Sequence, residues 1–226
     1  ERLSSLHAPV PVLHPGELAA HADVVVEALP AAVFREVAVP TLEAGRTFVT
    51  LSVGALLDHE DLIELARRFD ARIHVPTGAL LGLDAVRAAG YGKIHGVTMR
   101  TRKPPMGLAG APYLEERGLD MAAVVEPTRV FAGTAREAAR GFPANVNVAA
   151  ALALAGIGPD RTTIEIWADP TVTRNTHTID VDADSTRFTM TIEGVPSEEN
   201  PRTGKLTPLS VLATLQGMVA PLHVGT

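Results

Sequence analysis

A chain of 226 residues is long enough to bury one or two hydrophobic cores. Hydrophobic residues make up 46% of the chain. No apolar run approaches the roughly 18 residues that a membrane span needs, and the N-terminus does not resemble a signal peptide. We therefore expect a cytoplasmic globular protein with no membrane partner. The net charge of −6, with both signs mixed along the chain, argues against nucleic acid as a partner, and the lack of cysteine excludes disulfides and thiolate chemistry.

The first 90 residues alternate between short β-branched runs and helical segments. Strands are expected at about residues 23–28, 46–52 and 71–76, and helices at 31–44, 58–69 and 80–89. Gly45 is the residue expected to end the first helix, and Asp58 is the expected cap of the second. This alternation predicts right-handed parallel crossovers and therefore an α/β fold with a Rossmann-type doubly wound parallel sheet.

The pattern changes after about residue 90. Strands are expected at residues 94–103, 129–132, 162–167, 176–181 and 187–193, helices at 134–140, 145–155 and 208–219, and a Gly- and Pro-rich loop at 106–128. Residues 91–206 are therefore expected to form a catalytic α+β domain with a mainly antiparallel sheet. The last segment, 207–226, is expected to return to the first domain, residues 1–90.

The Gly-rich phosphate loop of a dinucleotide-binding sheet is missing from this pattern. Such a sheet opens with a strand, a Gly-rich turn and a helix within roughly 30 residues. The nearest similar string, Gly90-Tyr91-Gly92, has the wrong spacing and lies between a helix and a strand, so we reject it as a phosphate loop. The Rossmann-type sheet is expected to be incomplete here, and the natural protein to carry additional N-terminal residues.

His177 is the candidate for proton transfer. An imidazole with an ordinary pKa of about 6.5 suits acid–base work near neutral pH. The alternative is a hydrogen-bonded structural histidine. Asn175 lies two residues earlier, so on a strand it would share a face with His177 and orient either the ring or the substrate.

Two further positions are candidates for binding a ligand. Asn145 and Asn147 open an apolar helix; Asn145 is the expected cap, which makes Asn147 the better ligand candidate. Gly78-Ala79 follows the third strand, where ligands of open α/β sheets bind, and a Gly-Ala pair lets a flat ring approach the backbone. The alternative for this pair is an ordinary strand-to-helix turn.

Basic residues alternate along the end of the long strand at 94–103. A solvated sheet edge is the usual explanation for Arg100, Arg102 and Lys103, but a dicarboxylate substrate requires a cation, and we select Lys103 for it. No metal is expected: the aspartates within residues 180–184 lack the following Gly and Glu of a calcium loop, and the histidines form no His-x-x-x-His pair.

Taken together, several short motifs resemble those of the L-aspartate dehydrogenase family. They occur in the family's order at residues 52–56, 76–79, 82–85, 101–105, 142–149, 168–170, 175–177 and 200–203. The resemblance covers nearly the whole chain, from about residue 23 to 215. One departure is Thr77, where Ser is more usual, and the other is the missing phosphate loop.

This resemblance implies a two-domain enzyme that uses NAD or NADP to oxidise L-aspartate to iminoaspartate, or to aminate oxaloacetate reductively. It implies that His177 is the active-site residue, that Ala79 and Asn147 contact the cofactor, and that the enzyme is a homodimer built through the second-domain sheet. Two alternatives stay open. One is a related two-domain reductase of another small amino or keto acid, and the other is a non-catalytic ligand-binding dimer that lacks the phosphate loop.

Overall fold

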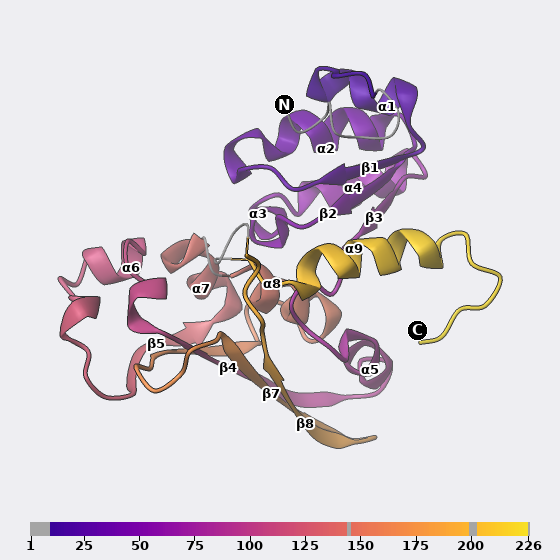
Figure 1. Ribbon diagram of the computed structural model, residues 1–226. Coiled ribbons are helices and arrows are strands. Elements are labelled where there is room, and N and C mark those ends of the chain that lie inside the picture. Colours follow the sequence, from indigo (N-terminus) through magenta and orange to yellow (C-terminus); the bar gives the residue numbers. More distant parts are fainter. Residues whose placement is uncertain (1–9, 144–145, 199–202, 226) are drawn as a thin grey trace. The chain divides into compact units, whose positions relative to one another are not determined.

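The computed structural model describes residues 10–143, 146–198 and 203–225 (Figure 1). Its contacts divide the chain into two compact units, the first formed by residues 1–52 and 59–74 and the second by residues 53–58 and 75–226. This division differs from the expected domain boundary at residue 90. Residues 75–90 and the C-terminal helix group with the second unit, because their contacts are made there.

The first unit contains a parallel three-stranded sheet in the order β1-β2-β3. Its strands are β1 (Val24–Glu27), β2 (Thr47–Thr50) and β3 (Arg72–His74). Its helices are η2 (Pro15–Glu17), α1 (Leu18–His21), η3 (Ala31–Val33), α2 (Phe34–Glu43) and α4 (Asp61–Arg68). The three predicted strands and their parallel pairing are confirmed, as a partial Rossmann-type sheet.

The helices of this unit differ in detail from those expected. The segment 31–44 is not one helix, since its first turn is the 3₁₀ helix η3; α2 then ends before Gly45, which has the positive φ of 67° expected of a helix-ending glycine. The cap predicted at Asp58 is wrong. Asp58 is the last residue of α3 (Val53–Asp58), and α4 begins only after Glu60, whose side chain makes no capping bond.

The second unit contains a five-stranded mixed sheet in the order β5-β6-β4-β7-β8. Its strands are β4 (Ile94–Lys103), β5 (Thr128–Thr134), β6 (Thr163–Ala168), β7 (Thr176–Ala183) and β8 (Arg187–Glu193). Among the described strands the β4–β6 pair is parallel and the other three pairs are antiparallel, so the prediction of a mainly antiparallel sheet is confirmed. The long strand β4 therefore lies at the centre of the sheet.

Helices cover one face of this sheet, where α7 (Ala135–Gly141) and α8 (Asn147–Ala155) lie along it in Figure 1. The core between them includes Val97 and Met99 of β4 and Leu152 of α8. The helix α8 consists almost wholly of apolar residues, and its middle part, residues 149–153, is buried. Other helical segments of the unit are α5 (Leu83–Ala89), η4 (Pro105–Gly107), α6 (Pro112–Glu115), η5 (Met121–Ala123) and α9 (Leu206–Gly217). Of the helices described, none is long and apolar enough to cross a bilayer.

Candidate active site

His177 lies near the start of β7, directly opposite Thr101 of β4 in the antiparallel pairing. Both side chains are buried, with 4% of His177 and 3% of Thr101 exposed. The Nδ1 atom of His177 and the Oγ1 atom of Thr101 are 3.0 Å apart, which is hydrogen-bond distance. The imidazole is therefore held by one hydroxyl group on the helix-covered face of the sheet.

Lys103 emerges on the same face as Thr101, because it lies two residues further along β4. Only 7% of the residue is exposed. The segment is not a sheet edge, since β4 is central and is flanked by β6 and β7, although Arg100 and Arg102 on the other face are partly exposed. Burial lowers the pKa of the Lys103 ammonium from 10.5 to about 8, so most of the amine is still protonated at neutral pH.

The electrostatics of His177 follow from this arrangement. Burial is the larger cause that lowers its pKa, and the positive charge of Lys103 is the second; together they bring the value from 6.5 to about 4. At neutral pH the site thus combines an uncharged imidazole with a cationic ammonium. A buried cation beside a neutral proton acceptor suits an anionic substrate that carries a transferable proton.

Arg102 points to the opposite face of β4 and pairs with Asp169, which follows β6. Asp169 is 1% exposed and accepts hydrogen bonds from the backbone N–H and the hydroxyl group of Thr171, at 2.9 and 2.6 Å, and from Arg102 at 2.9 Å. These bonds, those from Thr171 first, lower the pKa of the Asp169 carboxyl. The backbone N–H of Asp169 also donates to the carbonyl of Lys103 at 2.8 Å. Asp169 therefore anchors the end of β4 at which Lys103 lies.

Asn147, the first residue of α8, joins this helix to α3. Its Oδ1 atom accepts a hydrogen bond from the backbone N–H of Gly54 at 2.9 Å. A Cβ atom at Gly54 would lie 2.9 Å from Val146, so glycine is required for this close approach. Asn147 thus has a structural contact that the sequence did not reveal. Asn145, the expected cap of this helix, lies outside the described residues.

Ala79 is half-buried in the turn that follows Pro76. Its neighbour Gly78 has a φ of 64°, and the Gly78 N–H donates to the Ser210 hydroxyl of α9 at 3.1 Å. A Cβ atom built at Gly78 would meet no atom within 4 Å. There is thus open space beside the backbone at Gly78, and the role of Ala79 in binding a ligand stays a prediction.

Asn175 lies one residue before β7 begins, so the strand register does not extend to it. Its backbone carbonyl accepts a hydrogen bond from Gly194 at 2.8 Å. Within the described part of the chain, the partner of the His177 ring is Thr101 and not Asn175. Sequence reasoning missed Thr101, although the alternation along β4 places it on the face of Lys103.

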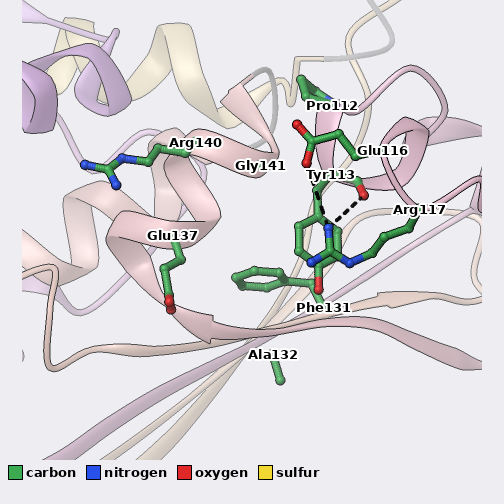
Figure 2. A pocket seen from close by; sticks show the side chains of 9 residues that line it. All are labelled: Pro112, Tyr113, Glu116, Arg117, Phe131, Ala132, Glu137, Arg140 and Gly141. Atoms are coloured by element: carbon green, nitrogen blue, oxygen red, sulfur yellow. Dashed lines mark hydrogen bonds and ion pairs between the residues drawn. The ribbon is translucent and has the colours of Figure 1, made fainter.

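A cavity of about 390 Å³ lies elsewhere in the second unit, and none of the predicted site residues lines it. Figure 2 shows the side chains around it. Its lining residues are Pro112, Tyr113, Glu116, Arg117, Phe131, Ala132, Glu137, Arg140 and Gly141. The Arg117 guanidinium lies 3.6 Å from the centroid of the Tyr113 ring, and Glu137 accepts hydrogen bonds from Thr134. These two charged groups are therefore held by local contacts.

The described residues contain no group of three or more His, Asp or Glu side chains that could hold a metal ion.

Comparison with known proteins adds independent information. The family model "Aspartate dehydrogenase, C-terminal" matches residues 84–218, and "Homoserine dehydrogenase, NAD binding domain" matches residues 1–76. The chain is 56% identical to L-aspartate dehydrogenase 3 of Bordetella bronchiseptica and 55% identical to L-aspartate dehydrogenase of Bradyrhizobium diazoefficiens. Each match covers 99% of this chain, and 82% and 80% of the respective relatives. The crystal structure of aspartate dehydrogenase from Thermotoga maritima is similar with a TM-score of 0.75 and 25% identity, over 100% of this chain and 88% of that one.

Proposed function

Because this chain belongs to the L-aspartate dehydrogenase family, we propose that it oxidises L-aspartate to iminoaspartate with NAD or NADP, or aminates oxaloacetate in reverse. It is an NAD(P)-dependent amino-acid dehydrogenase by this membership. The observation that carries the substrate assignment is the buried pair of Lys103 on β4 and His177 on the neighbouring strand β7, which lie on one face of the sheet.

Two residues of the second unit are suited to binding the nicotinamide end of the cofactor. Open space beside Gly78 allows a flat ring to approach the backbone at Ala79, and the Asn147 amide, anchored through its oxygen to Gly54, has an NH₂ group for a polar ligand. We assign Ala79 and Asn147 to the nicotinamide end of the cofactor. The nicotinamide, when bound, accepts the hydride that leaves the α-carbon of the substrate.

Lys103 supplies the cation for a carboxylate of the substrate in this proposal. A buried ammonium attracts an anion strongly because little water screens it, and the dicarboxylate brings the opposite charge into the site. Asn175 is assigned to hydrogen bonding with the substrate from the loop before β7. A binding site of this composition favours dicarboxylates over amino acids with neutral side chains.

His177 takes the proton in this mechanism. It accepts one proton from the substrate ammonium, directly or through water, and the resulting amine drives out the hydride from the α-carbon. The nitrogen lone pair then forms the second bond of the carbon–nitrogen double bond, which gives the protonated imine. This imine is released or is hydrolysed to oxaloacetate.

Substrate binding adjusts the basicity of His177. In the free protein the charge of Lys103 contributes to the low pKa of His177, which makes the imidazole a weak base. A carboxylate bound at Lys103 offsets that charge, so the pKa of His177 rises when the substrate arrives. The imidazole thus becomes a better proton acceptor in the complex than in the free protein.

The test is a substrate panel with the full natural chain. Oxidation of NADH and of NADPH is followed with oxaloacetate plus ammonia, and with other 2-keto acids such as pyruvate and 2-oxoglutarate. Preferential turnover of oxaloacetate supports the proposal. Preference for another keto acid would favour the related reductase, and tight binding without turnover of any of them would favour a non-catalytic binding protein.

A homodimer built through the five-stranded sheet also belongs to this proposal. The sheet face opposite the helices carries Trp167 and a network of ion pairs that includes Arg100 with Asp180, at 2.7 Å, and Arg100 with Glu165, at 3.5 Å. Trp167→Glu would place a further charge on that face, and sedimentation analysis should then give a monomer. A cytoplasmic location stays a prediction from composition.

A further inference from the structure

The contact between Thr101 and His177 is the strongest feature of this site that the proposed mechanism has not used. The two residues are register partners on neighbouring strands, and 3.0 Å separates Oγ1 from Nδ1. Directly opposite positions on antiparallel strands bring their Cβ atoms within about 5 Å of one another. The contact is therefore fixed by the pairing of β4 with β7 and does not depend on a mobile loop.

The hydroxyl group of Thr101 occupies one ring nitrogen of His177, which leaves the other nitrogen for the substrate. A neutral imidazole has one donor and one acceptor nitrogen, and the partner of one nitrogen decides which role the other takes. A hydroxyl group can accept a hydrogen bond from Nδ1–H, which orients the ring without adding charge and leaves Nε2 as the acceptor nitrogen. A carboxylate in the same place would favour the imidazolium form, whereas the hydroxyl adds no charge that opposes the effects of burial and of Lys103.

We propose that Thr101 is a positioning residue for the reaction, whose hydroxyl group holds Nδ1 of His177 so that Nε2 is the nitrogen that meets the substrate. This inference rests on the proposed function of His177. The proton from the substrate ammonium is taken up at Nε2, while Nδ1–H donates to Oγ1 of Thr101. The buried charge of Lys103 is the one that acts on this imidazole in the described residues.

A purely structural role for Thr101 makes a different prediction. Threonine is common in strands because its branched side chain packs well on a pleated sheet, and valine has nearly the same shape. If Thr101 served only packing, Thr101→Val would preserve both fold and activity. If its hydroxyl group orients His177, the same variant leaves Nδ1 without its partner and lets the ring turn.

The experiment compares Thr101→Val with Thr101→Ser in the full natural chain. We expect Thr101→Val to lower kcat for L-aspartate by about 10²-fold, the order reported for small misplacements of reacting groups, with little change in the Kd for NADH. Thr101→Ser restores the hydroxyl group and should recover most of the turnover. Thr98→Val, on the opposite face of β4, is the matched control and should behave as the unmodified enzyme.

A second readout is independent of turnover. The ¹⁵N chemical shifts of the His177 ring should indicate one dominant tautomer in the unmodified protein and in Thr101→Ser, and a mixture in Thr101→Val. The pH profile of kcat/KM should change in Thr101→Val and return in Thr101→Ser. Unchanged kcat in Thr101→Val, or a ring that samples both tautomers in the unmodified protein, would overturn the inference.

The two readouts separate this inference from the function on which it rests. If the unmodified protein fails to oxidise L-aspartate, the proposed function fails, and the tautomer measurement alone then decides whether Thr101 holds Nδ1. If it oxidises L-aspartate but Thr101→Val is equally active, the function stands and the positioning role is rejected.

Discussion

The charge of Lys103 acts directly on the imidazole of His177, because both side chains emerge on the helix-covered face of one sheet. Burial lowers the pKa of each group, to about 8 for Lys103 and to about 4 for His177. The positive charge on the lysine makes protonation of the histidine still less favourable. In the proposed mechanism, a substrate carboxylate bound at Lys103 would relieve this repulsion and so link substrate binding to proton transfer.

The buried ammonium should reduce the stability of the free protein. Between pH 8 and 10.5 the unfolded chain holds a proton that folded Lys103 has lost, so the stability rises with pH in that window. Lys103→Met should therefore raise the free energy of unfolding at pH 7, by about 1–3 kcal/mol. The same variant should bind L-aspartate more weakly. Urea denaturation and steady-state kinetics measure the two effects.

Lys93→Met is the matched control for that prediction, since Lys93 is an exposed lysine just before β4. It should leave both the stability and the KM for L-aspartate close to those of the unmodified protein. A Lys103→Met protein that is less stable at pH 7 than the Lys93→Met protein would contradict the assignment of Lys103 as a costly buried cation.

The loss of unfolding free energy at acid pH should depend in part on the protonation of His177. Between about pH 4 and 6.5 the unfolded chain binds a proton that the folded His177 does not, so stability is lost as the pH falls through this window. The slope from this one group is at most about 1.4 kcal/mol per pH unit. His177→Gln should have a shallower slope in urea denaturation at stepped pH, while the exposed His95→Gln serves as control. Equal slopes for all three proteins would speak against the low pKa of His177.

Asn147 should have two separable roles. Asn147→Ala leaves the buried N–H of Gly54 without its acceptor, so it should lower the free energy of unfolding by about 1–3 kcal/mol and also weaken the binding of NADH. Asn147→Asp keeps an acceptor oxygen for Gly54 but loses the amide NH₂. It should recover most of the stability while cofactor binding stays weak, as measured by NADH fluorescence. Recovery of both properties would leave Asn147 with a structural role only.

Asp169 should stabilise the end of β4 next to Lys103. Asp169→Ala removes the acceptor for two hydrogen bonds from Thr171 and the partner of Arg102, with an expected loss of about 1–3 kcal/mol in unfolding free energy. The low pKa of Asp169 means that this contribution is present at neutral pH and is lost as the carboxyl becomes protonated in acid. Asp182→Ala, at an exposed position of β7, is the control, and an equal loss there would contradict this role.

Local patterns in the sequence predicted much of this fold. The strand expected at residues 94–103 agrees with β4 at both ends, and Pro104 and Pro105 follow directly after it. The alternation of strand and helix likewise predicted the parallel sheet of the first unit. The helix expected at residues 58–69 was less accurate, since Asp58 ends α3 and α4 begins at Asp61. Boundaries of this kind depend on caps and tertiary contacts that propensity does not contain.

The contacts within the candidate site depend on strand pairing between residues far apart in the sequence, which local patterns do not reveal. Alternation along β4 places Thr101 and Lys103 on one face, but their burial follows from the central place of β4 and from the helices that cover this face, which the sequence pattern does not specify. The contact of Thr101 with His177 joins residues 76 positions apart and requires the correct register between β4 and β7. Similarly, the bond from Gly54 to Asn147 joins residues 93 positions apart. The motifs supplied candidate residues, and the pairing of the strands decides which of them are in contact.

The central claim is that His177 accepts the proton when L-aspartate is oxidised. The most direct measurement is the kcat of His177→Ala in the full natural chain with L-aspartate, together with the Kd for NADH and with His95→Ala as the matched control. We predict that kcat falls by about 10²–10⁴-fold, the usual range for general acid–base help, while the Kd for NADH stays nearly unchanged. Full turnover by His177→Ala would contradict the claim.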